Sequence, residues 1–455
     1  MGSLNDDAMF LLLARTLRAG RFALPDGTGL PLTDPLPGFS VLLMLPEKWL
    51  AGHWDALRLL SLGISWLCLW TTWRLARRVL PPKWAAAATI LVAVNTVFLI
   101  HCGVVLPDIL YTAVSLWALA ELPGKKSAGR LAMLAAAACA AALIRPQGLV
   151  LAGALALGVF AQVGFPRACG FAAASLTPAA LWALRNRLGA GTATHYLQTW
   201  TAGMPQLQSG GQRLHCARLA ATLLGEGMLG LIGMPFWALL GSAGAVLALC
   251  GYGAARRLGK EQDAAVFAMT VYTAGLLLLH ATWSLEYIRY LLPLLPLLWI
   301  LVLLGARELP AFWPRAAAVL GVVIVLAALR DDLRFLNAQS GRQKTLWPQT
   351  MAWVAEHTPP AAQLQSPYYA PLMYFTGRPT IAAFGPLEPE AWLQACRERG
   401  VEYEVVDLNF ARWSAGTGAG PSKTSPPFSD PRVHEVYRNP EEGSVVLRIE
   451  RPRGS

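Results

Sequence analysis

Long apolar runs, separated by short basic or polar segments, fill the chain as far as Leu329. A helix needs about 20 mostly apolar residues to cross a membrane, although several of these runs are shorter. We predict ten spans, with the limits Leu57–Leu75, Trp84–His101, Ile109–Leu122, Leu131–Leu143, Gly148–Val163, Ala168–Leu184, Met234–Tyr252, Ala264–Trp283, Leu291–Leu304 and Ala316–Leu329. The pattern therefore indicates an all-helical, polytopic membrane domain over residues 55–330.

The segment before the first span, residues 1–54, contains no run long enough to cross a membrane. A surface helix ending near Arg18 is predicted there by the helical spacing of Phe10, Leu13, Ala14 and Leu17. Prolines follow, and then comes a short apolar run, Gly38–Leu45. We interpret both segments as helices that lie on the membrane surface.

Residues 331–455 are polar, rich in proline and mixed in charge, which indicates a small soluble α/β domain. Periodicity predicts helices at Met351–His357 and Glu388–Glu398, and strands at Leu364–Ser366, Thr380–Ala383, Glu402–Leu408, Val433–Tyr437 and Ser444–Ile449. Ala415–Ser429 is predicted to be a mobile loop of Gly, Ser and Pro. The domain lacks a nucleotide-binding fingerprint, so we interpret it as a lid or scaffold.

Composition supports a membrane protein, since 55% of the residues are hydrophobic and 14% are charged. Soluble chains usually carry about 25% charged residues. The seven cysteines include no Cys-x-x-Cys pair, so the sequence supports neither a zinc site nor a disulfide framework.

The net charge of +11 is concentrated in short loops next to the apolar runs, which is a poor pattern for nucleic-acid binding. Loops rich in Lys and Arg next to membrane helices face the cytoplasm. One alternate set of loops is the richer, with Arg74 to Lys83, Lys125 to Arg130, Arg167, Arg256 to Lys260, and Arg307 with Arg315. We therefore predict that residues 1–54, the loop after His101, the stretch Arg185–Gly233 and the C-terminal domain face outside. Sharing one compartment, they can contribute to one site.

Three aspartates are candidates for chemistry on that outer side. Asp6 and Asp7 open the first surface helix, and Asp108 follows a proline at the edge of a span, one loop from His101. Such carboxylates can act as a general base or bind a divalent cation. The structural alternatives are that Asp6 and Asp7 complement the helix dipole and that Asp108 is an N-cap.

Three arginines, Arg145, Arg185 and Arg289, lie at outer span edges, and Tyr290 follows the last of them. A guanidinium group suits a phosphate through its planar fork of donors, so these residues could form a cationic pocket for a phosphate in the outer leaflet. The structural alternative is that the arginines snorkel or anchor helices at the interface.

Several segments, in this order, resemble elements of one family. They are Asp6-Asp7-x-x-Phe10-x-x-x-Ala14, Leu32–Pro37, Ile144-Arg-Pro-Gln-Gly148, Arg289-Tyr-Leu-Leu-Pro293 and Trp353–Thr376. The chain is similar nearly end to end to the GT-C glycosyltransferases that use polyprenyl-phosphate sugars, in the branch of protein mannosyltransferases and the lipid A aminoarabinose transferase. It departs from that family in having Asp7 in place of Glu and Phe10 in place of Tyr. The family also has a membrane helix before the acidic pair, so we expect one to be encoded upstream of Met1.

The resemblance implies a fold, a reaction and roles for the residues. Asp6 would be the base that takes a proton from the acceptor, and Asp7 and Asp108 would shape the site or bind a divalent cation, Mg²⁺ or Mn²⁺. Arg289, with Arg145 or Arg185, would hold the lipid phosphate beside Tyr290. The reaction would be an inverting sugar transfer from a polyprenyl-phosphate donor to a lipid, glycan or protein acceptor, on the outer face of a bacterial-type cytoplasmic membrane.

Two other functions stay open on the sequence: a transporter or flippase for a lipid-linked glycan, and a membrane scaffold without activity. Transporters tend to show repeated halves and polar sites near the middle of the membrane. Here the halves are not visibly related, and the acids gather at the outer edge. The sequence identifies neither the sugar nor the acceptor.

Overall fold

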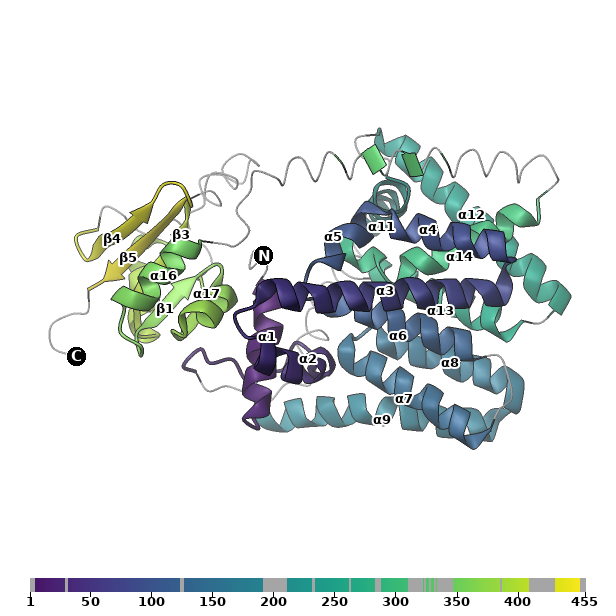
Figure 1. Ribbon diagram of the computed structural model, residues 1–455, viewed down its shortest axis with the longest axis horizontal. Helices are drawn as coiled ribbons and strands as arrows, with labels where there is room; N and C mark the ends of the chain where they lie inside the picture. The colour runs from purple at the N-terminus through teal and green to yellow at the C-terminus, as the bar shows by residue number, and fades with distance from the viewer. Residues whose placement is uncertain are drawn as a thin grey trace. The chain divides into compact units, whose positions relative to one another are not determined.

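The computed structural model describes residues 5–28, 32–122, 127–190, 211–230, 234–261, 263–282, 288–309, 347–384, 387–408 and 430–450, together with scattered positions between 322 and 333 (Figure 1). The chain divides into two compact units. The first, which we call the sheet unit, comprises Met1–Leu32, Ser40–Trp54 and Arg342–Ser455. The second, the helical unit, comprises Thr33–Phe39 and Asp55–Gly341.

The helical unit is built from the apolar runs. Its elements are α3 (Trp54–Val79, whose first residue belongs to the sheet unit), α4 (Pro82–Ala93), α5 (Thr96–Cys102), α6 (Pro107–Glu121), α7 (Ala128–Ile144), α8 (Gly148–Val163), α9 (Phe165–Ala190), α11 (Gly211–Ala220), the π-helix η1 (Ala221–Met228), α12 (Phe236–Glu261), α13 (Ala264–Ala281), the 3-10 turn η2 (Ile288–Leu291) and α14 (Leu294–Arg307). Every span predicted between residues 57 and 304 coincides with a helix or a bent helix pair. The tenth, Ala316–Leu329, lies mostly outside the described residues.

Length and hydropathy separate these helices into two kinds. Among the described residues, Phe236–Gly259 and Ala264–Ala281 are long and apolar enough to cross a membrane, and α4 with α5 makes a bent pair that also qualifies. The apolar helices α7, α8 and α14 are shorter. In α14 every residue from Leu294 to Ala306 is buried, so protein surrounds its apolar surface. The helical fold is confirmed, but of the ten predicted spans only these two helices and the bent pair meet the length and hydropathy needed to cross a membrane among the described residues.

The predicted span Trp84–His101 is bent rather than straight, because α4 and α5 meet at 64°. Asn95 caps α5, since its Oδ1 accepts a hydrogen bond from the Val97 backbone N–H at 3.0 Å. The Asn95 amide donates to the carbonyls of Gly227 at 2.9 Å and Met228 at 3.2 Å in η1. One polar side chain thus starts the second helix and fixes the bend to a neighbouring element.

Small residues allow α12 and α14 to cross closely. A Cβ atom on Gly305 would lie 2.1 Å from the carbonyl oxygen of Leu249, and one on Gly253 would lie 2.4 Å from the Gly305 nitrogen. Glycine at such a crossing lets two backbones touch, which favours helix association in a membrane.

The sheet unit combines the chain's two ends. Its elements are α1 (Asn5–Arg18), most of α2 (Pro37–Leu50), α16 (Pro348–His357), β1 (Gln363–Ser366), α17 (Tyr369–Thr376), β2 (Thr380–Ala382), α18 (Pro389–Glu398), β3 (Val401–Asp407), β4 (Val433–Asn439) and β5 (Ser444–Ile449). The predicted helices and strands of this part are found, whereas α17 was not predicted. The predicted loop Ala415–Ser429 lies outside the described residues.

The five strands form one mixed sheet in the order β2-β1-β3-β5-β4. β1 pairs in parallel with both β2 and β3, and β5 pairs antiparallel with β3 and β4. One core, which includes Met351, Val354 and Leu372, joins α16 and α17 to the sheet. A second core, which includes Trp392 and Cys396, joins α18 to it. We call residues 347–450, which form this sheet and its helices, the C-terminal domain.

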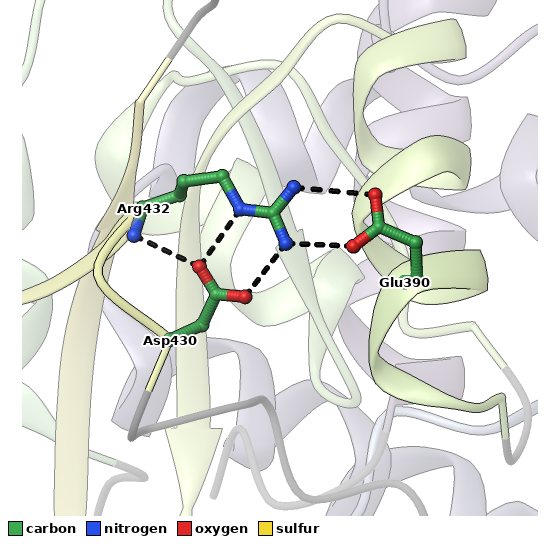
Figure 2. Close-up of polar contacts among 3 residues, drawn as sticks. All are labelled: Glu390, Asp430 and Arg432. Atoms are coloured by element: carbon green, nitrogen blue, oxygen red, sulfur yellow. Dashed lines mark hydrogen bonds and ion pairs between the residues drawn. The ribbon is translucent and has the colours of Figure 1, made fainter.

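An exposed charge cluster fastens β4 to α18 (Figure 2). The Arg432 guanidinium donates to Asp430 at 2.8 and 2.7 Å and to Glu390 at 3.2 and 2.6 Å. These hydrogen bonds from Arg432 hold the pKa of Asp430 down at about 2. The bidentate geometry fixes the start of β4 against the first turn of α18.

Candidate functional site

Asp6 and Asp7 lie in the first turn of α1, as predicted, but the two side chains differ. Asp7 is 1% exposed, and its Oδ1 accepts a hydrogen bond from the Ala8 backbone N–H at 2.8 Å. Asp6 is half-buried. Of the pair, Asp6 is the more exposed carboxylate, and Asp7 accepts a hydrogen bond within its own helix.

A buried acid that the sequence analysis missed anchors α1 to α2. The side chain of Glu47 is 1% exposed and receives Arg15, whose Nε lies 2.9 Å away, together with Arg18. The Ser40 hydroxyl also donates to the Phe10 carbonyl at 3.3 Å. The only sequence signal for Glu47 is an acid within an apolar run.

Helix α1, which carries Asp6 and Asp7, packs against α17 of the C-terminal domain, and both helices belong to the sheet unit. The Arg15 guanidinium lies 4.7 Å from the centre of the Tyr374 ring, a cation–π distance. Trp54 packs edge-on against the same ring at 5.3 Å. The C-terminal domain therefore helps to hold the helix that carries Asp6.

Asp108 and Arg145 form a buried ion pair in the helical unit. Asp108 is 5% exposed and Arg145 is 8% exposed. The N-cap of α6 is Leu106, so the prediction that Asp108 caps this helix is wrong. Burial also excludes snorkelling as the role of Arg145. The two residues are 37 positions apart, and only the tertiary structure joins them.

A tight connection from α7 to α8 places Arg145, which is the C-cap of α7. A Cβ atom on Gly148 would lie 2.3 Å from the Ala142 nitrogen, and one on Gly38 would lie 2.8 Å from the Leu143 carbonyl carbon. The chain around Arg145 is therefore packed backbone to backbone, which fixes where its guanidinium points.

Arg289 approaches the same region from η2, which packs against α5. Asp108, Arg145 and Arg289 all lie close enough to His101 of α5 to act on it electrostatically. His101 is itself fixed by a 2.7 Å hydrogen bond between Nδ1 and the Val97 carbonyl. One acid, two arginines and a histidine thus gather in the helical unit.

Tyr290 supports Arg289. The Arg289 guanidinium lies 5.9 Å from the centre of the Tyr290 ring, and this ring stacks on His280 at 5.2 Å with an interplanar angle of 10°. The half-buried Arg289 is therefore held on an aromatic platform and can present its cation to a phosphate.

Arg185 is held by other partners. Its guanidinium lies 4.8 Å from the Trp182 ring and donates to the Asn186 Oδ1 at 2.9 Å. The Asn186 amide donates in turn to the Thr33 carbonyl at 3.1 Å. These contacts tie α9 to the segment before α2.

A second buried acid, Glu121, ends α6, and the sequence analysis also missed it. It forms ion pairs with Arg74 of α3 and with Arg130 of α7, the latter at 2.8 Å. At about 1.5 Å per residue, Asp108 and Glu121 lie roughly 20 Å apart on α6. Each end of α6 thus carries one buried acid that forms an ion pair with arginine from a neighbouring element.

The residues do not form a ready metal centre. In the described parts of the chain, no three His, Cys, Asp or Glu side chains come together in a way that could hold a metal ion. Asp7 is bonded to its own helix, and Asp108 is paired with Arg145. Both carboxylates thus already accept a protein donor, which does not fit a shared site for Mg²⁺ or Mn²⁺.

No family model and no curated protein matches the chain. Solved structures do match. ArnT from Cupriavidus metallidurans bound to undecaprenyl phosphate is 13% identical with a TM-score of 0.57, over 97% of this chain and 93% of that chain. Its apo state gives the same identity and coverage with a TM-score of 0.59.

A second kind of enzyme also matches. The oligosaccharyltransferase AglB from Archaeoglobus fulgidus, in complex with an inhibitory peptide and a dolichol-phosphate, is 14% identical with a TM-score of 0.57, over 92% of this chain and 67% of that chain. The same archaeal enzyme in complex with Zn and sulfate is 16% identical with a TM-score of 0.58, over 94% and 67%. The chain therefore has the GT-C membrane fold of these two transferases.

Proposed function

We propose that this protein is an integral membrane glycosyltransferase that moves a sugar from a polyprenyl-phosphate donor to an acceptor. The observation that carries the proposal is the match, over 97% of the chain, to a transferase solved with undecaprenyl phosphate bound. The half-buried carboxylate of Asp6 and the arginine held on an aromatic platform in η2 supply the two kinds of group that this reaction needs.

In the proposed reaction an acceptor hydroxyl or amine attacks the anomeric carbon of the donor sugar. The bond from that carbon to the lipid phosphate breaks, and the phosphate leaves with the electron pair. Asp6 takes the acceptor proton as general base, a role that typically contributes a factor of about 10² to 10⁴. A single displacement inverts the anomeric configuration.

We assign the lipid phosphate to Arg289, because charge builds up on the leaving phosphate and a fixed cation stabilises it. Tyr290 keeps this guanidinium in place. Arg145 has a different role, since it neutralises Asp108 inside the helical unit. Asp108 then acts as a charged support that holds Arg145, rather than as a second base. The reaction takes place on the outer face of the cytoplasmic membrane.

The test is turnover by purified protein in detergent or nanodiscs. Undecaprenyl-phosphate sugars of several kinds are supplied with candidate acceptors, and the release of undecaprenyl phosphate is measured. We expect Asp6→Asn to lower kcat by about 10² or more, because the base is lost while the shape is kept.

The matched control is Asp55→Asn, which removes an acid whose side chain is 91% exposed at the start of α3. This variant should turn over like the wild type. Full activity in Asp6→Asn would reject Asp6 as the base. If no donor is consumed by the wild type, the transporter or scaffold function becomes the better explanation.

A further inference from the structure

Tyr369 occupies a position in the C-terminal domain where α/β proteins often build sites. It is the first residue of α17, which follows the carboxyl end of β1. β1 lies between β2 and β3 and is parallel to both, and the helices that follow β1 and β2, α17 and α18, pack in two different cores of the sheet. In open α/β sheets, ligands bind beyond the carboxyl ends of the strands at such a switch point.

The side chain of Tyr369 reaches α1. Its hydroxyl contacts the Sδ of Met9 at 3.9 Å. Met9 is three residues after Asp6, so both lie on the same face of α1. Burial, followed by the charges of Asp6 and Asp26, raises the pKa of Tyr369. The hydroxyl thus donates to Met9, three residues along α1 from the proposed base.

The loop that carries Asp26 is fixed against β1. The Thr28 backbone N–H and hydroxyl both donate to the Asp26 Oδ1, at 2.9 and 2.7 Å. A Cβ atom on Gly27 would lie 2.7 Å from the Oε1 of Gln363, so this loop sits directly on the first residue of β1. This contact holds the segment that carries Asp26 within the sheet unit.

Resting on the proposed function, we infer that Tyr369 is a positioning residue for the transfer, through which the C-terminal domain sets the orientation of Asp6. The Tyr369 O–H, which donates to the weak acceptor Sδ of Met9, can turn to donate to the carboxylate of Asp6 and limit its rotamers. The C-terminal domain is then part of the reacting site.

The neighbouring Tyr368 offers a matched control, because its hydroxyl is directed to Asp407 at the end of β3. Burial and that carboxylate raise the pKa of Tyr368 to about 12. Its ring packs on Trp347 at 5.1 Å. Tyr368 and Tyr369 are therefore adjacent in the chain, but their hydroxyls contact different residues.

The first experiment is a double-mutant cycle on the release of undecaprenyl phosphate. We expect Tyr369→Phe to lower kcat about tenfold with the KM for the lipid donor changed less than about twofold, since it acts on the base and not on the phosphate. In an Asp6→Asn background the same substitution should cause no further loss, because residues that act as a unit are not additive. Tyr368→Phe should keep the wild-type kcat.

The inference is overturned if Tyr369→Phe turns over like the wild type, or if its effect multiplies with that of Asp6→Asn. A wild type that consumes no donor would instead refute the proposed function and with it the role of Tyr369. The placement is tested without turnover by Tyr369→p-benzoylphenylalanine in the full chain. Its photo-cross-link should map to the Met9 peptide of α1, whereas position 368 should cross-link within the C-terminal domain, and absence of the α1 product overturns the inference.

Discussion

At the scale of single residues, buried acids are stabilised in two ways. Asp108, Glu47 and Glu121 are each matched by arginine. Glu404 of β3 instead accepts a 3.3 Å hydrogen bond from the Gln365 amide in the core of the C-terminal domain. Acids paired in this way depend on their arginine partners, whereas burial without a cation beside it raises the pKa of Glu404.

The Arg145–Asp108 pair gives the first prediction. Arg145→Met should lower the stability of the purified protein by about 3 to 5 kcal/mol, because it leaves an uncompensated carboxylate buried. Thermal unfolding in detergent measures the loss. Asp108→Leu combined with Arg145→Met should recover most of it, since an apolar pair of similar volume has no charge to bury. Equal losses in the single and double variants would contradict the ion pair as the cause.

Glu404 gives a pH-dependent prediction. Burial raises its pKa from 4.5 to about 8. Between these values the unfolded domain has lost the proton that the folded domain keeps, so the free energy of unfolding falls as pH rises, by about 1.4 kcal/mol per pH unit. Below 4.5 and above 8 this contribution is constant. Glu404→Gln should remove the slope.

The measurement is the urea dependence of maleimide labelling at Cys396, a buried thiol in the same core. At each pH the labelling rate of the folded protein is divided by the rate of the unfolded chain, which removes the pH dependence of the thiol itself. Mass spectrometry identifies the labelled cysteine. The same slope in wild type and Glu404→Gln would show that another group causes the pH dependence.

At the scale of elements, the apolar run predicts a helix, and polar or small residues decide how the helices bend and meet. Asn95 turns the second predicted span into the pair α4 and α5. Gly253 and Gly305 bring α12 and α14 into backbone contact. These residues are single exceptions in apolar surroundings, and their effect depends on a partner far away in the sequence.

The α12–α14 crossing gives a prediction with an internal control. Gly305→Ala should lower the thermal stability by about 1 to 3 kcal/mol or more, because its Cβ would meet the Leu249 carbonyl and force the helices apart. Gly244→Ala adds a methyl group to α12 where no atom lies within 4 Å. That control should be neutral or stabilising by up to about 1 kcal/mol, through helix propensity. Equal effects at both positions would refute close packing as the reason for Gly305.

The elements of the C-terminal domain show what periodicity can and cannot find. The alternation of Val401–Asp407 marks a half-buried strand, and β3 is found there. The helix α17 escaped prediction because its run, Ala-Pro-Leu-Met-Tyr-Phe, is short and almost wholly apolar. Such a run fits a buried strand or a buried helix equally well. Tyr369, at the start of α17, was missed with it.

At the scale of the whole molecule, the distribution of positive charge gives a prediction about orientation. In a cysteine-free background, Lys125→Cys should react with a membrane-impermeant maleimide from the cytoplasmic side, and Arg289→Cys should react from the outside. Labelling of intact cells, followed by labelling after permeabilisation, distinguishes the two. Reaction of both positions from the same side would contradict the predicted orientation.

The sequence by itself determined where the helices and most strands lie. Hydrophobic periodicity is a local property of the chain, and the folded protein buries the apolar positions that this periodicity marks. The sequence also placed candidate acids and arginines at the ends of apolar runs. Only the tertiary structure decided their partners. Arg145 pairs with Asp108, Arg289 lies over Tyr290, and α17 brings Tyr369 to Met9 of α1. Pairing of this kind depends on contacts between distant segments, which no local pattern encodes.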